Sequence, residues 1–233
     1  MIAPFGRILK PPFGPRLAAA GDDNWWLSGG IVAANCIAAY QPIGADDIAD
    51  SYINVANSGT YNATPGTAPT WDAVNGWKFL ASSSQYLGTG GIIVPNDQTW
   101  SIIIKYSNYL EPNKAVSFSR KTGGANTCDF GLYRPNNDTL SYYSGSVKNT
   151  THVGTLACVQ AIAGNQPYLD GATDGATITA GADVNDVELV IGAINIDGSM
   201  ALYFTGHIQA YSLYNTAVSG AQVAAVGTAM NAL

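Results

Sequence analysis

The sequence predicts an all-β protein: an antiparallel β-sandwich with an extended N-terminal arm and a short C-terminal helix. The observations behind this are sparse charge, abundant turn residues and regularly spaced apolar segments. Of the 233 residues, 11% are charged and 47% are apolar, and the chain has 26 Gly and 11 Pro. Gly and Asn adopt the positive-φ conformations that tight turns need, as expected for many short strands. A chain of this length fits one large sandwich.

Residues 1–24 are predicted to form a basic, Pro-rich arm, and residues 25–233 the sandwich. Proline disfavours both helix and strand ladders, and no uninterrupted apolar segment typical of a signal peptide is present. Residues 1–21 carry three basic and no acidic side chains, whereas the remainder carries seven basic and sixteen acidic ones. A frayed tail is the alternative. The arm residues expected to contact an assembly are Phe5, Arg7, Ile8, Leu9, Lys10, Phe13 and Arg16.

After the arm, apolar and β-branched segments alternate with turn signals at the spacing of roughly 8–12 residues that is typical of a sandwich. Residues 57–75 have turn chemistry throughout and are predicted to be a loop. Ser219 and Gln222 form a capping-box pattern, which predicts a helix over residues 220–231. The predicted strands are 31–40, 76–80, 85–87, 99–106, 115–119, 129–133, 140–143, 155–163, 167–169, 187–191, 200–204 and 206–214.

Four segments occur in an order that resembles a known family. They are VNGWKFLASSSQYLGTGG (74–91), TWSIIIKYSN (99–108), QPYLDGATDGA (166–176) and the long block that begins ELVIGAINIDGSM (188–226). Together they resemble the concanavalin A-like and laminin-G-like jelly-roll domains, of the phage virion type. The resemblance implies a jelly-roll sandwich. One departure is Gln209, where members often have an acidic residue, so a calcium role of that acid does not transfer.

Catalysis on this scaffold would be glycoside cleavage, which needs two carboxylates about 5–9.5 Å apart. Asp186 and Glu188 stand at i and i+2 and would share a strand face, but the third acid of the family pattern is missing. The alternative is a strand that begins with solvated acids. His207 is expected to be a hydrogen-bonded structural residue and His152 a surface residue. We therefore assign no catalytic residue and expect a protein that is not an enzyme.

No cofactor is expected, with calcium at Asn195 and Asp197 as the alternative, because Asx oxygens in loops are calcium ligands. The same residues before Gly are also ordinary turn formers. Two further acidic loops, 46–50 and 170–174, allow the same two interpretations. The three cysteines show no zinc spacing and are expected to be buried apolar residues, with one disulfide pair left open. They are Cys36, Cys128 and Cys158.

Glycan binding is the remaining site hypothesis, because sugars are held by aromatic faces together with short polar side chains. These aromatic residues could instead pack the edges of the sandwich or a subunit interface. Trp25 and Trp26 are expected to anchor the arm to the core. The candidate glycan-binding residues are Trp71, Asp72, Asn75, Tyr109, Tyr133, Asn136, Asn137, Asp138 and Tyr143.

The main functional expectation is a non-enzymatic virion structural or decoration protein of a phage. Its arm would dock on other copies or on a capsid or tail protein, and its sandwich would face outward and contact surface glycans. The alternatives are a free-standing lectin-like carbohydrate-binding module at the cell surface or outside the cell, and a glycoside hydrolase. The acidic body disfavours nucleic acid, and no apolar run is long enough to cross a membrane.

Overall fold

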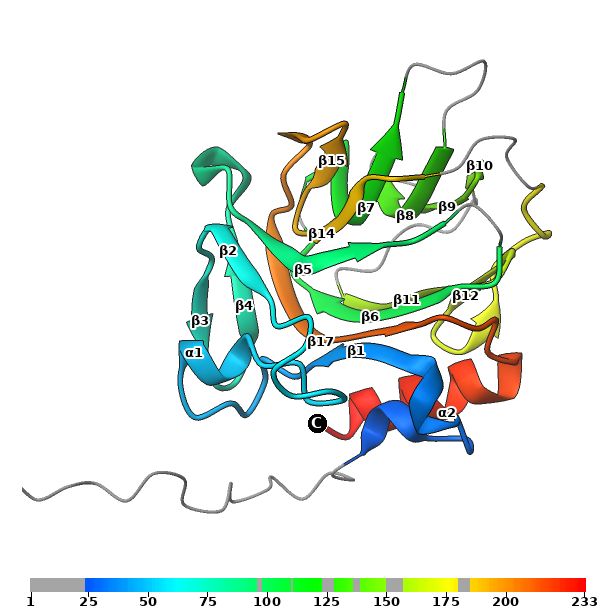
Figure 1. Cartoon of the computed structure of the whole chain (residues 1–233), viewed down its shortest axis with the longest axis horizontal. Coiled ribbons are helices and arrows are strands. Elements are labelled where there is room, and N and C mark those ends of the chain that lie inside the picture. Colours follow the sequence, from blue (N-terminus) through cyan, green and yellow to red (C-terminus); the bar gives the residue numbers. More distant parts are fainter. Residues whose placement is uncertain are drawn as a thin grey trace, which may run out of the picture.

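The computed structural model describes residues 24–95, 98–109, 111–122, 128–135, 139–149, 157–179 and 185–233, without the side chains of residues 128 and 146–149. Two β-sheets pack face to face, and a helix lies along the outer side of one of them (Figure 1). The all-β sandwich and the C-terminal helix are therefore confirmed. The arm residues of the prediction lie outside the described residues.

Sheet A has the strand order β13-β12-β11-β6-β17-β4-β3, and β1 also pairs with β17. All pairings in this sheet are antiparallel, and β6 pairs with β17 from Ser107 opposite His207 to Ser101 opposite Tyr214. Its strands are β1 (Cys36–Tyr40), β3 (Thr70–Asp72), β4 (Gly76–Phe79), β6 (Ser101–Ser107), β11 (Ala157–Ala163), β12 (Gln166–Leu169), β13 (Ala172–Thr173) and β17 (Gly206–Tyr214).

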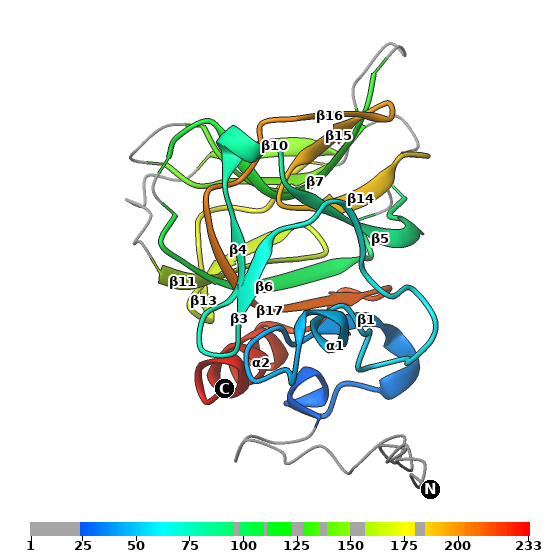
Figure 2. The ribbon, with the colours of Figure 1, turned by 90° about the vertical axis from the view of Figure 1, so that its left-hand side faces the viewer.

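Sheet B has the order β10-β9-β8-β7-β14-β5-β2. Strand β15 pairs in parallel with β7 and forms a hairpin with β16, at the top of the molecule in Figure 2. The strands of sheet B are β2 (Thr64–Thr67), β5 (Tyr86–Ile93), β7 (Lys114–Lys121), β8 (Cys128–Arg134), β9 (Ser141–Ser144), β10 (Ser146–Asn149), β14 (Glu188–Ile191), β15 (Ile194–Ile196) and β16 (Ser199–Ala201).

Helix α2 (Gly220–Asn231) begins at the predicted capping box, in which Ser219 and Gln222 bond each other's backbone N–H groups. Helix α1 (Ile48–Ser51) begins at Asp47, whose side chain accepts from the backbone of Asp50. Among the described residues, no helix is long and apolar enough to cross a membrane. Three 3₁₀ turns complete the elements: η1 (Trp25–Leu27), η2 (Ala33–Asn35) and η3 (Ala81–Ser83).

The three consecutive isoleucines of β6 explain why sheet A is buried on both faces. Side chains alternate across a strand, so Ile102 and Ile104 enter the main core between the sheets. Ile103 points to the other face, where it joins a second apolar cluster with α2 and η1. Trp25 and Trp26 belong to that cluster and are 0% and 7% exposed, so they lie in the core as expected.

The loop prediction needs correction. The segment 57–75 was expected to be a loop throughout, yet it contains β2 and β3. Both strands are short and lie at sheet edges, where turn-rich residues can still pair on one side.

Cys36 and Cys158 are buried free thiols, as expected, and burial raises the pKa of the Cys36 thiol to about 12. The side chain of Cys128 is outside the described residues.

Asn54 holds the segment between β1 and β2 in place. It is 0% exposed. Its side-chain oxygen accepts three backbone N–H groups, including that of Ala39 at 3.0 Å. Its side-chain nitrogen donates to the carbonyls of Ile37 and Thr60 at 3.0 and 2.8 Å. This one amide therefore bonds the outer edge of β1 to the irregular segment that follows it.

We expect Asn54→Ala to lower the free energy of unfolding by about 3 kcal/mol, because it leaves several buried backbone groups without partners. Urea unfolding of the variant measures this. The exposed neighbour Asn57 is the control, and Asn57→Ala should leave the unfolding midpoint nearly unchanged. Equal effects of the two substitutions would contradict the role assigned to Asn54.

Candidate functional site

The structure separates the predicted glycan-binding residues into three places. Trp71, Asp72 and Asn75 lie in the β3–β4 hairpin at the edge of sheet A. The indole N–H of Trp71 donates to the Pro42 carbonyl at 2.7 Å. The carboxylate of Asp72 accepts the backbone N–H of Asn75 at 2.7 Å, and this bond lowers its pKa. The polar atoms of this group therefore build the hairpin turn.

Tyr109 is a core residue. Its side chain is 1% exposed and its hydroxyl donates to the Lys114 carbonyl. Its ring meets Tyr106 and Phe204 at centroid distances of 5.4 and 4.8 Å, and the Arg134 guanidinium lies 5.2 Å from the ring centre. A ring enclosed in this way offers no face to a ligand, so the structure does not support its assignment to a glycan site.

Tyr133 and Tyr143 do come together, on the face of sheet B that points away from the core. Their ring centroids are 6.3 Å apart, and both rings approach Phe118 of β7, at 6.4 and 4.7 Å. Burial raises the pKa of both tyrosines, so the rings are neutral phenols at neutral pH. The other members of this predicted cluster, Asn136, Asn137 and Asp138, lie outside the described residues.

A glycine between the rings makes room for them. Gly131 pairs with Phe118 on one side and with Tyr143 on the other, and its φ is +147°. A Cβ at this position would lie 2.2 Å from the Ser117 carbonyl and 2.7 Å from Phe118 Cα. Only glycine fits, and the missing side chain lets the two rings meet across the middle strand.

An ion pair borders the aromatic group. Arg120 Nε and Nη2 each donate to one oxygen of Asp129 at 2.7 Å, and these bonds raise the pKa of the guanidinium. Asp129 is 5% exposed. The guanidinium carbon lies 5.5 Å from the Phe118 ring centre and 5.9 Å from that of Tyr143. Such forked, partly buried pairs have a fixed geometry.

These side chains enclose a hollow of about 140 Å³, which we call the tyrosine hollow. Its remaining wall is apolar and comes from the β15–β16 hairpin. Leu202 has a φ of +49°, a conformation that costs a leucine about 1 kcal/mol or more. Its carbonyl accepts the Ala115 N–H at 2.9 Å, which fixes this backbone. The described lining residues are Phe118, Arg120, Tyr133, Tyr143, Ile194 and Leu202.

Sequence reasoning missed Phe118, Arg120, Asp129 and Leu202. A signal was present for three of them. Phe118 lies in the predicted strand 115–119 and Arg120 follows two residues later, and Asp129 and Tyr133 stand at i and i+4 in the predicted strand 129–133, so each pair would share a face of an extended chain. The pairing of these two strands through Gly131 could have placed these two pairs of residues together. Nothing in the local sequence indicates that Leu202 would join them.

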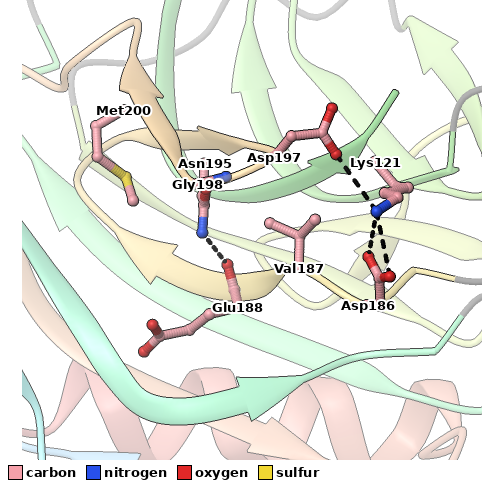
Figure 3. A pocket seen from close by; sticks show the side chains of 8 residues that line it. All are labelled: Lys121, Asp186, Val187, Glu188, Asn195, Asp197, Gly198 and Met200. Atoms are coloured by element: carbon pink, nitrogen blue, oxygen red, sulfur yellow. Dashed lines mark hydrogen bonds and ion pairs between the residues drawn. The ribbon is translucent and has the colours of Figure 1, made fainter. Parts of the chain in front are cut away.

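A second, open hollow of about 540 Å³ lies on the other side of the β15–β16 hairpin (Figure 3). Lys121 Nζ lies 2.9 Å from a carboxylate oxygen of Asp186 and 3.8 Å from one of Asp197. The described lining residues are Lys121, Asp186, Val187, Glu188, Asn195, Asp197, Gly198 and Met200. The ammonium group thus supplies positive charge between two of the acids.

The predicted calcium ligands act as turn formers here. The side-chain oxygen of Asn195 accepts the Gly198 N–H at 2.8 Å, and its nitrogen donates to the Glu188 carbonyl at 2.9 Å. Asp197 accepts the hydroxyl and the N–H of Thr122, which lowers its pKa. Within the described ranges no group of three or more His, Cys, Asp or Glu side chains can hold a metal ion. Calcium at this loop stays a prediction.

The other acidic loops also serve the backbone. Asp47 caps α1 by accepting the Asp50 N–H at 2.8 Å. Asp170 accepts the Val159 N–H at 2.8 Å, and buried Asp174 accepts the Tyr142 hydroxyl at 2.6 Å. His207 lies in β17 with Nδ1 3.1 Å from the Asn108 amide nitrogen, a structural contact as predicted. His152 is outside the described residues.

Asp186 and Glu188 do not share a strand face, because β14 begins only at Glu188. The Glu188 carboxylate points away from Asp186 (Figure 3) and accepts the N–H groups of Thr89 and Gly91 at 3.0 and 2.9 Å. These groups belong to a bulge of β5, where the register with β14 shifts. The only acid pair that favoured a glycosidase is therefore split between an ion pair and a backbone contact.

No protein-family profile matches the chain, and no curated protein matches it in sequence. Solved structures do. A Trypanosoma rangeli sialidase mutant displaying trans-sialidase activity has a TM-score of 0.55 and 15% identity over 85% of this chain and 34% of its own. The same sialidase in complex with sialic acid gives 0.53 and 16%, over 82% of this chain and 32% of its own.

The CBM40 of a Ruminococcus gnavus IT-sialidase, bound to α2,3-sialyllactose, has a TM-score of 0.43 and 20% identity over 55% of this chain and 82% of its own. The chain spans about a third of the length of the T. rangeli structures. At identities this low, the comparison with those sialidases shows the fold alone. This chain shares a β-sandwich with part of a sialidase chain.

We expect Glu188→Ala to lower the free energy of unfolding by about 2 kcal/mol, because two bulge N–H groups lose their acceptor. Asp186→Ala should leave the thermal unfolding midpoint nearly unchanged, because the side chain of Asp186 is 63% exposed and surface ion pairs contribute little. Calorimetry of both variants measures this. A catalytic acid pair would instead give two stable variants that both lose a hydrolytic activity.

Proposed function

We propose that the chain is a non-enzymatic carbohydrate-binding module that holds one sugar ring in the tyrosine hollow. The observation that carries this proposal is the meeting of Phe118, Tyr133 and Tyr143 on an outer sheet face, beside the Arg120–Asp129 pair. A T. rangeli sialidase of similar fold was solved with sialic acid. That likeness concerns the fold alone, so the support for sugar binding comes from the residues of the hollow itself.

The chemistry of the hollow suits a sugar. A pyranose has apolar C–H faces and a rim of hydroxyl groups, so it needs an aromatic surface and a few fixed polar groups. The phenol rings supply the first, and the guanidinium held by Asp129 supplies the second. A volume of about 140 Å³ is well below the ~300–1,000 Å³ of drug-sized sites and accommodates one ring.

A binding role is better supported than glycoside cleavage. Most glycosidases place two carboxylates on either side of the scissile bond. Among the described residues around the tyrosine hollow, the carboxylate is that of Asp129, and both of its oxygens are bonded to Arg120. This is one carboxylate rather than two, and both of its oxygens serve the ion pair with Arg120.

We expect Tyr143→Ala to weaken glycan binding by about tenfold or more, because a central aromatic side chain contributes at least about 1.4 kcal/mol to such contacts. Titration calorimetry with a glycan first identified on an array measures this. Tyr86→Ala is the matched control, because Tyr86 is also half-buried and contacts Tyr203 outside the hollow. Equal losses in both variants, or none in either, would place the glycan elsewhere.

The virion role is a second proposal and rests on residues 1–24, of which 1–23 lie outside the described residues. In it, the basic arm docks on other copies or on a capsid or tail protein, and the module faces outward on the virion. A cell-surface or extracellular location is the alternative. The described start of the chain is compatible with a removable arm, because Trp25 already packs in the core beneath α2.

Deletion of residues 1–23 should therefore leave thermal stability and glycan binding unchanged and should abolish incorporation into an assembly. Calorimetry and co-sedimentation with assembled particles measure the two effects. A chain that carries Arg7→Gln, Lys10→Gln and Arg16→Gln separates the charge of the arm from its length. Normal incorporation of the deleted chain would exclude the assembly role of the arm.

A further inference from the structure

We infer that the tyrosine hollow selects an uncharged sugar with an apolar substituent, such as the methyl group of a 6-deoxyhexose or of an acetamido group, over an acidic sugar. The inference rests on the proposed glycan-binding function and names the ligand class of the same site. It is argued from the pairing of Arg120 with Asp129, from the apolar wall of the hollow and from the strained backbone of Leu202.

The charge of the hollow argues against an acidic sugar. Arg120 is the one charged side chain among the six described lining residues. Arginine has five N–H donors, and two of them, on Nε and Nη2 of Arg120, bond the two oxygens of Asp129, so one of its two carboxylate-binding edges is occupied. The pair has no net charge, and a ligand carboxylate would lie close to the buried Asp129 carboxylate. Repulsion therefore offsets the attraction of the guanidinium.

The aliphatic wall of the hollow favours an apolar substituent. Ile194 is 2% exposed and packs with Phe118 and Ala115. Leu202 is half-buried against the same cluster. This corner of the hollow is therefore formed by aliphatic and aromatic carbon, next to the phenol rings. A ligand methyl group there would leave water, whereas a hydroxyl group would lose hydrogen bonds to water without replacement.

The backbone of Leu202 supports the same conclusion independently. A leucine at φ +49° is strained, and glycine would adopt this conformation without cost. Strain at one residue persists where the surroundings hold it, and such residues cluster at binding sites. Leucine here places an aliphatic side chain against the hollow at the expense of backbone stability.

An array of neutral and acidic glycans, probed with the full chain and with Tyr143→Ala, tests the inference. The expected result is that the glycans whose binding depends on Tyr143 are uncharged. If those glycans are acidic, the inference is overturned and the proposed function stands. If no glycan on the array depends on Tyr143, the proposed function itself fails at this hollow.

Three monosaccharides, used as competitors, then test the effect of the substituent alone. 6-Deoxygalactose, galactose and galacturonic acid differ only at C6, where they carry a methyl, a hydroxymethyl and a carboxylate group. If the Tyr143-dependent glycans end in galacto-configured sugars, the methyl compound should compete with them about fourfold better than galactose, because galactose would bury a hydroxyl group without a partner, at a cost on the order of 1 kcal/mol. For an N-acetylhexosamine terminus, the acetamido and hydroxyl forms replace this pair. The acid should compete least, and an acid that competes best overturns the inference.

Two further measurements examine the ion pair. Binding of the neutral glycan should be unchanged between low and high salt, because an uncharged ligand has no interaction for salt to screen. Asp129→Asn frees the guanidinium and should raise the affinity for acidic relative to neutral glycans by about tenfold, the effect of one charge-assisted hydrogen bond. Thermal unfolding shows whether this variant folds. An unchanged ratio in a folded variant overturns the charge argument.

Leu202→Gly examines the wall. Glycine accepts the backbone conformation, so the variant keeps the φ of the parent and loses only the aliphatic side chain. The preference for methyl-bearing over hydroxyl-bearing sugars should disappear, with an affinity ratio of about one. A preference that stays at fourfold would show that the wall does not contact the substituent and would overturn this part of the inference.

Discussion

Burial of sheet A on both faces is the constraint from which the placement of the site follows. Ile102 and Ile104 pack toward sheet B, while Ile103 packs toward α2 and η1. A sheet enclosed in this way has no broad face left for a ligand. Among the described residues, the outer face of sheet B carries a small apolar cluster and the short β15–β16 hairpin. The proposed sugar site therefore lies on sheet B.

Within sheet B, one glycine and one ion pair give the outer face the shape of the tyrosine hollow. Gly131 lets Phe118 and Tyr143 meet across three strands. The Arg120–Asp129 pair holds the guanidinium against both rings. Both features rest on contacts within sheet B itself, so they shape the hollow without a ligand. Preorganised sites of this kind lose little conformational entropy on binding.

Several carboxylates of this protein stabilise its own backbone. Glu188 holds a bulge of β5, Asp72 closes a hairpin, Asp47 caps α1 and Asp197 accepts the backbone of Thr122. Short irregular strands leave many N–H groups without ladder partners, and acidic side chains satisfy them. This use of acids accounts for the failure of Asp186 and Glu188 to form the pair that their spacing suggested.

The sequence by itself determined the two-sheet fold, the limits of β17 and α2, and the burial of Trp25 and Trp26, because these depend on local turn chemistry, capping and alternation. It also pointed to Tyr133 and Tyr143. Only the tertiary structure decided that Tyr109 is buried, that residues 57–75 contain edge strands, and that Phe118, Arg120 and Leu202 complete the hollow. These outcomes depend on strand pairing between distant segments, and pairing register is set by the packing of the whole sheet rather than by neighbours in the chain.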